Sequence, residues 1–157
     1  MGALIISALV AGLLAAPAGA RKGKIIASPS FQMPEQMLVP PRPEGSATVS
    51  ATISGKLGLR GCFTSAWSDG RKVKCSKAVR KTCVSHRSIK VTALQSQTPT
   101  QWVTAGADGS FTATVVFEDD FLTVHLSLGP IRSQRKGLRI ICYPMDSFSV
   151  DVSEAHP

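Results

Sequence analysis

The chain has 157 residues, and its 43% of hydrophobic residues is ordinary for a globular protein, which excludes wholesale disorder. Its 18 Lys and Arg residues outnumber its 10 Asp and Glu residues, so the formal net charge is +8. Beyond residue 20 the sequence has no apolar stretch of roughly 18 residues, which excludes a protein with several transmembrane helices.

Residues 1–20 predict a signal peptide. Residues 3–20 form an apolar run, and Ala18-Gly19-Ala20 at its end fits the pattern of small residues that signal peptidase cuts. The positive charges follow this run instead of preceding it, so an uncleaved membrane anchor is the alternative. Cleavage is favoured because the run is rich in Ala and Gly and therefore weakly hydrophobic. We expect a protein without a membrane span that is secreted to the extracellular space or the cell wall.

The four cysteines predict two disulfides, as expected for an exported chain. Cys62 and Cys75 lie symmetrically about the turn signal Ser68-Asp69-Gly70, as cross-strand partners in a hairpin do. This symmetry favours Cys62–Cys75 with Cys83–Cys142, and the alternative is Cys75–Cys83 with Cys62–Cys142. No Cys-x-x-Cys pair is present, so the sequence predicts neither a zinc site nor a redox site.

Residues 21–46 predict a Pro-rich linker or arm. Five prolines lie here among Ser, Gln and Glu, a composition that favours extended polyproline conformation over a packed core. Apolar exceptions such as Phe31 and Met37 would let part of the arm lie against a domain. The expected domain itself covers residues 47–157.

Within residues 47–157, apolar and polar residues alternate with a period of two, which is typical of half-buried strands. The alternation covers residues 47–54, 89–93, 111–117 and 122–128, and shorter strands are expected at 138–143 and 148–152. Turn signals separate these segments, and no window shows helical periodicity. Short antiparallel strands at this spacing predict a β-sandwich or a small barrel.

Three segments resemble transthyretin-like and carboxypeptidase-regulatory-like domains: Ile53-Ser54-Gly55-Lys56, residues 89–93, and the Thr104–Phe111 hairpin with its Ala-Asp-Gly-Ser-Phe sequence. Pollen-allergen and extensin-like secreted proteins are similar in that hairpin. The resemblance implies an all-β, immunoglobulin-like or transthyretin-like antiparallel sandwich of about seven strands. It also implies a protein that is usually non-catalytic, and it supplies no catalytic residues. The sequence departs from these families at residues 60–86, a long basic insertion that carries cysteines.

Positive charge is concentrated in residues 71–90, which hold eight basic residues and no acidic one. These are Arg71, Lys72, Lys74, Lys77, Arg80, Lys81, Arg87 and Lys90. A second run without acids contains Arg132, Arg135, Lys136 and Arg139, in an expected loop before Leu138 and the start of the next strand. If the two runs meet at one end of the sandwich, they form a surface that binds polyanions with release of counterions. A solubilising loop is the plainer explanation.

The first functional hypothesis is therefore a secreted, non-enzymatic binding module that contacts a polyanion through the basic loop 71–90. The expected partner is an acidic polysaccharide, an anionic surface or an acidic protein. Nucleic acid is disfavoured, because exported proteins seldom meet it. The alternative is a structural or assembly subunit of an extracellular or cell-surface complex that docks through the Pro-rich arm.

Signals for catalysis and for metal binding are weak. His86, His125 and His156 belong to no catalytic or zinc-binding motif, and we expect Glu118-Asp119-Asp120 to be a solvated turn instead of a calcium site. We therefore predict no enzyme activity, no cofactor and no metal. Trp67 is expected to pack across its own hairpin, and Trp102 to be a partly buried residue of the sandwich.

Overall fold

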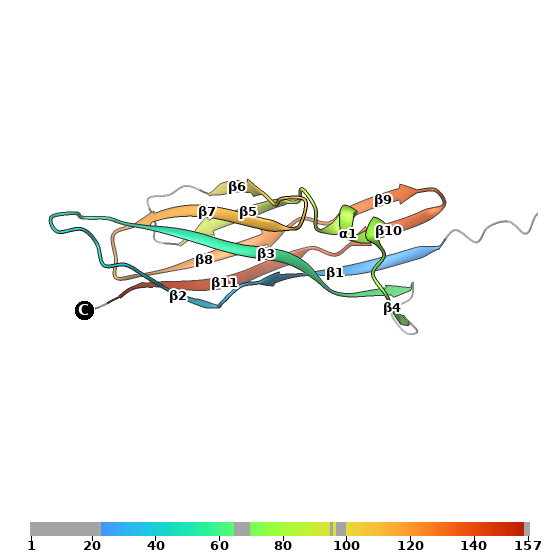
Figure 1. Ribbon diagram of the computed structural model, residues 1–157, viewed down its shortest axis with the longest axis horizontal. Coiled ribbons are helices and arrows are strands. Elements are labelled where there is room, and N and C mark those ends of the chain that lie inside the picture. Colours follow the sequence, from blue (N-terminus) through green and yellow to red (C-terminus); the bar gives the residue numbers. More distant parts are fainter. Residues whose placement is uncertain (1–22, 65–69, 95, 97–99, 156–157) are drawn as a thin grey trace, which may run out of the picture.

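The computed structural model describes residues 23–64, 70–94, 96 and 100–155. Over these residues the chain forms eleven strands and one short helix, and the strands build two sheets that pack as a sandwich (Figure 1). The predicted all-β sandwich is confirmed, with eleven strands among the described residues instead of about seven. The sheets are mixed, not purely antiparallel, because β1 pairs parallel with β10 and β2 pairs parallel with β11.

Sheet A contains β1 (Lys24–Gln32), β3 (Val49–Thr64), β4 (Lys72–Val73), β7 (Ser110–Phe117), β9 (Ile131–Arg135) and β10 (Leu138–Cys142). Its order is β4-β3-β1-β10-β9, and β7 also pairs with β3. The long β3 serves two partners: residues 49–56 pair with β7 and residues 56–64 pair with β1. Sheet A therefore extends well beyond the part that β7 completes.

Sheet B contains β2 (Gln36–Val39), β5 (Ser88–Ala93), β6 (Gln101–Thr104), β8 (Phe121–Leu128) and β11 (Met145–Glu154). Its order is β2-β11-β8-β5-β6. Alternate residues of both sheets meet in the main core, and the largest of them that are fully buried include Ile53, Val115, Phe117, Ile89, Leu122 and Leu126. The period of two in the sequence thus marks the inward-facing residues.

The prediction of a linker over residues 21–46 is wrong for residues 24–39, which contain two strands of the sandwich. β1 lies inside sheet A between β3 and β10, and β2 forms an edge of sheet B. Pro29 is tolerated because it lies at a register shift opposite β3 and beyond Ala27, the last residue of β1 that pairs with β10. Residues 33–35 connect β1 to β2, and residues 40–48, which include the end of the Pro-rich segment, form the loop between β2 and β3.

The opposite end of the molecule from the helix is closed by Arg42, which sequence reasoning did not single out. Its side chain forms ion pairs with Glu154 at 2.9 Å and with Asp120 at 3.4 Å. It also donates to the carbonyl oxygen of Glu118 at 3.0 Å. The hydrogen bond to Glu154 raises the pKa of Arg42 above its ordinary value. This residue joins the loop after β2 to the β7–β8 turn and to β11.

The helix α1 (Lys77–Cys83) was not predicted, and it lies inside the expected insertion at residues 60–86. Ser76 caps its first turn by accepting a hydrogen bond from the backbone N–H of Val79. Val79 and Cys83 are the buried residues of the helix. At seven residues the helix is too short to produce a helical period in the sequence. The remainder of this insertion contains the end of β3 and the short strand β4.

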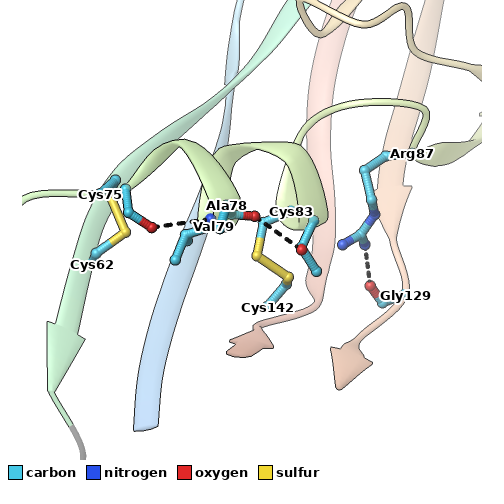
Figure 2. The surroundings of a disulfide bond; sticks show 10 residues. Cys62, Cys75, Ala78, Val79, Cys83, Arg87, Gly129 and Cys142 are labelled. Atoms are coloured by element: carbon cyan, nitrogen blue, oxygen red, sulfur yellow. Dashed lines mark hydrogen bonds between the residues drawn. A yellow bond between two sulfur atoms is a disulfide. The ribbon is translucent and has the colours of Figure 1, made fainter. Parts of the chain in front are cut away.

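Two disulfides fasten the segment around α1 to sheet A on both sides of β1 (Figure 2). Cys62–Cys75 and Cys83–Cys142 are formed, which confirms the favoured pairing. Ala27 of β1 pairs with Cys62 on one side and with Cys142 on the other, so all three residues lie in one row across the sheet. Ala27 is fully buried and belongs, with Val79, to a second hydrophobic cluster. The helix thus packs across β1.

Helix α1 takes the place of sheet B over the extended part of sheet A. Ala27 in the second cluster and Phe31 in the main core lie on the same face of β1, since they are four residues apart in a strand. Leu59 packs against both clusters and links them. Among the described residues, no helix is long and apolar enough to cross a membrane.

Candidate functional site

Helix α1 presents a row of cations to solvent. Lys77, Arg80 and Lys81 are exposed and lie three and four residues apart, so they share the face opposite the buried Val79 and Cys83. Arg80 and Lys81 lie in the last turn of the helix, where positive charge interacts favourably with the helix dipole. The local sequence therefore separates an apolar face against the sheet from a cationic face towards solvent.

The second basic run forms a hairpin, not the loop that the sequence predicted. Arg132 and Arg135 belong to β9, and Lys136 lies with Gly137 in the turn to β10, both with positive φ angles. Helix α1 contacts β9 and β10, and the Cys83–Cys142 disulfide joins the helix to β10 covalently. The two basic runs therefore meet at one end of the molecule (Figure 1).

The basic side chains at this end point from both faces of sheet A. Arg135 lies four residues after Ile131 in β9, so the two share a face of the strand. Since Ile131 packs in the cluster beneath α1, Arg135 lies on the helix side of the hairpin. Arg132 lies on the other face, in a row of paired residues that runs across five strands. That row consists of Arg132, Ile141, Ile26, Phe63 and Lys72. The positive charge thus surrounds the end of the sheet instead of forming a single flat surface.

The remaining predicted residues do not all lie at this end. Arg71 and Lys74 are exposed beside β4, close in sequence to α1. Lys90 lies on the outer face of sheet B, where it pairs with Trp102 of β6 and with Ser127 of β8. Trp102 is 64% exposed, so its prediction as a partly buried residue is wrong; the reason is that it faces outward on an edge strand. The prediction for Trp67 lies outside the described residues.

Arg87 does not belong to the surface, and its prediction as a binding residue is wrong. It is 3% exposed because it lies two residues before the buried Ile89, on the same inward face of extended backbone. One guanidinium nitrogen, Nη2, donates to the carbonyl oxygen of Gly129, as Figure 2 shows. The other, Nη1, is buried without a hydrogen-bond partner among the described residues. Burial away from water lowers the pKa of Arg87.

Replacing Arg87 with Met should stabilise the protein. The variant removes a buried cation whose Nη1 lacks a partner, and Gly129 remains exposed to water, which can serve its carbonyl oxygen. We expect the free energy of unfolding to rise by about 1–3 kcal/mol, the usual cost of an unpaired buried donor. Urea denaturation measures the change. The matched control is Arg87→Lys, which keeps the charge and should give no gain; a less stable Met variant would contradict the interpretation.

A groove of about 200 Å³ borders the cationic face of α1. It lies between the end of the helix, the middle of β3 and the hairpin that joins β6 to β7. Its lining includes Gln32, Lys56, Leu57, Arg80, Val84 and Asp108. Sequence reasoning missed this groove, because its residues come from five separate stretches of the chain.

The wall of the groove is held in place by Gly109 and Asp108. Gly109 has a φ of +88°, and a Cβ there would lie 2.3 Å from the carbonyl oxygen of Leu57, so the hairpin approaches β3 as only glycine allows. Asp108 accepts hydrogen bonds from the hydroxyl and the backbone N–H of Ser110. These bonds, helped by Lys56 at 3.5 Å, lower the pKa of Asp108 to about 2. Asp108 is therefore ionised at neutral pH.

In the described part of the chain, His86, His125 and the acidic turn do not assemble into a reactive group. His125 Nδ1 lies 2.9 Å from the hydroxyl oxygen of Ser149, and His156 lies outside the described residues. Asp120 of the acidic turn is paired with Arg42. Across the described part of the chain, no three His, Cys, Asp or Glu side chains are placed to hold a metal ion.

Comparisons with known proteins found no match for this chain among family models, curated proteins or solved structures. The interpretation of its function therefore depends on the geometry described above.

Proposed function

We propose that the protein is a secreted, non-enzymatic module that binds a polyanion through its basic end. The basic end is defined as the exposed cations of β4, α1 and the β9–β10 hairpin, with the residues that adjoin them. It comprises Arg71, Lys72, Lys74, Lys77, Arg80, Lys81, Arg132, Arg135, Lys136 and Arg139. The observation that carries the proposal is the joining of α1 to the hairpin by Cys83–Cys142, which brings together two basic runs far apart in the sequence.

The charge of the basic end is not neutralised within its own segments. Residues 70–86 and 131–142 contain no Asp or Glu. A partner with regularly spaced anionic groups would meet several of these cations at once and release counterions. Both disulfides restrain the backbone of the segments that carry the cations, so binding orders little additional backbone. These features support binding that is strong at low salt and weakens steeply as salt rises.

An extracellular location is compatible with the two disulfides, which persist in oxidising compartments. The signal peptide expected at residues 1–20 lies outside the described residues and stays a prediction. The alternative role, assembly through a Pro-rich arm, receives no support from β1, which is paired on both sides within sheet A and is not available to a neighbour. Among the described residues β2 pairs only with β11, so the edge of sheet B is the one part of this segment that could take a further strand.

Neutralising two cations on α1 should weaken binding to a sulfated or carboxylated column and flatten its salt dependence. In Lys77→Gln/Lys81→Gln, the slope of log affinity against log salt should fall by roughly one for each lost contact. The fold should be unaffected, since surface substitutions change stability by less than about 0.5 kcal/mol.

The matched control is Arg60→Gln/Lys90→Gln, which removes two exposed cations outside the basic end. Retention and salt slope should then stay close to those of the unchanged protein. If the control lowers both quantities as much as the α1 variant does, the binding depends on net charge alone, and the basic end has no special role.

A further inference from the structure

The groove beside α1 contains polar groups that the protein itself leaves unused. Gln32 lies across Gly58, where a Cβ would approach its side-chain nitrogen to 2.7 Å, so the amide packs directly over the backbone of β3. Among the described residues, neither the amide of Gln32 nor the guanidinium of Arg80 has a hydrogen-bond partner. Both side chains line the groove. The groove therefore offers an amide and a cation that are free to receive a ligand.

The other side of the groove supplies an acceptor and a small apolar surface. Asp108 lies opposite, with both carboxylate oxygens already fixed: Oδ1 by Ser110 and Oδ2 by Lys56 at 3.5 Å. An ionised carboxylate accepts hydrogen bonds and donates none, and each oxygen has more than one lone pair. Leu57 and Val84 also line the groove, but they are only 1% and 6% exposed, so the apolar surface between these polar groups is small.

We propose that this groove binds one uronic acid unit of an acidic polysaccharide. This inference deepens the proposed function, on which it depends, by naming the ligand class. Arg80 takes the sugar carboxylate, for which a planar guanidinium has matching geometry. Ring hydroxyls donate to Asp108 and bond with the amide of Gln32. At about 200 Å³ the groove is below the roughly 300–1,000 Å³ of sites for drug-sized ligands, so it fits a single small unit.

Asp108 makes the groove selective for a uronic acid unit over anionic groups that carry no hydroxyl. A carboxylate beside a binding cation repels phosphate or sulfate groups, which carry no hydroxyl to donate to it. A polymer of uronic acids carries hydroxyl donors next to each negative charge, so the same carboxylate contributes to its binding. Inorganic polyphosphate has no such donors, and it would use the basic end without the groove.

The test compares the binding of a short oligogalacturonate and of inorganic polyphosphate with a similar number of charges. Calorimetry at one fixed salt concentration measures both affinities for the purified protein. In Gln32→Ala, the affinity for oligogalacturonate should fall about three- to tenfold, as expected for one lost hydrogen bond, while polyphosphate binding stays unchanged. The control Gln134→Ala removes an exposed amide of β9 outside the groove and should change neither affinity.

The variant Asp108→Asn gives a result that charge alone would not produce. It adds one net positive charge, so a purely electrostatic site would bind both polymers more tightly. The proposal instead expects weaker oligogalacturonate binding and unchanged or tighter polyphosphate binding. Unchanged oligogalacturonate binding in Gln32→Ala, or tighter binding in Asp108→Asn, would overturn the groove while leaving the basic end intact. If the unchanged protein binds neither polymer, the proposed function fails first.

Discussion

Removal of residues 1–32 should leave a chain that does not fold. β1 pairs with β3 through eight of its residues, 25–32, and with β10 through residues 24–27, so its loss leaves one edge of each of these two strands without a partner. It also removes Ala27 and Phe31 from the two hydrophobic clusters. Since a domain is stable by only about 5–15 kcal/mol, this loss exceeds what the fold can absorb. Circular dichroism and thermal unfolding measure the outcome.

The control is a chain that begins at Gly23, which keeps every strand described above. It should unfold cooperatively, with the same midpoint as the longer chain. Adding a peptide of residues 23–32 to the truncated protein should restore some folded signal, whereas a scrambled peptide should not. A truncated protein that unfolds with the same midpoint as the control would show that β1 adds nothing to sheet A.

Loss of the Cys83–Cys142 disulfide should lower the free energy of unfolding by about 4 kcal/mol. This disulfide closes a loop with a sequence separation of 59, and the entropy of the unfolded chain grows with the length of loop released. The Cys62–Cys75 disulfide, with a separation of 13, should cost about 3 kcal/mol in the same treatment. Paired Cys→Ser variants and urea denaturation measure both values.

The two disulfide variants should also differ in binding. Without Cys83–Cys142 the helix is no longer joined to β10, so the two basic runs lose their fixed spacing and affinity for a polyanion should fall. The charge is unchanged, so the salt slope should change little. The Cys62–Cys75 variant keeps the helix joined to the hairpin and should lose less affinity. Equal affinities in the two variants would contradict a role for the helix–hairpin link.

The sequence predicts those elements whose residues obey one simple rule over enough length. Residues 122–128 alternate between apolar and polar without interruption, and residues 111–117 do so except at Val116; both are strands whose inward-facing apolar residues are buried. The disulfide pairing follows from the turn signal between Cys62 and Cys75, because β3 and β4 pair as the arms of a hairpin. In each case residues close in the sequence determine both the local structure and the contacts that it makes in the folded protein.

Other elements depend on contacts that no local pattern contains. In β1, Ala27, Pro29 and Phe31 are buried and alternate with polar residues, yet the prolines of the segment suggested a linker. Helix α1 is specified mainly by its cap and by its two buried residues, Val79 and Cys83. Arg87 faces inward because it continues the alternation of β5 by one residue towards the N-terminus, on the same face as Ile89. A basic residue at such a position carries no local signal that it is buried.

The parallel pairing of β1 with β10 and of β2 with β11 has a consequence for the way this protein is made. The first strands of the sandwich find their neighbours among the last ones to be synthesised. The N-terminal strands therefore cannot form all their backbone hydrogen bonds while the ribosome is still translating. The sandwich cannot fold strand by strand in the order of synthesis. Its high contact order predicts slow folding, with the edges of β3 exposed to aggregation until β1 inserts.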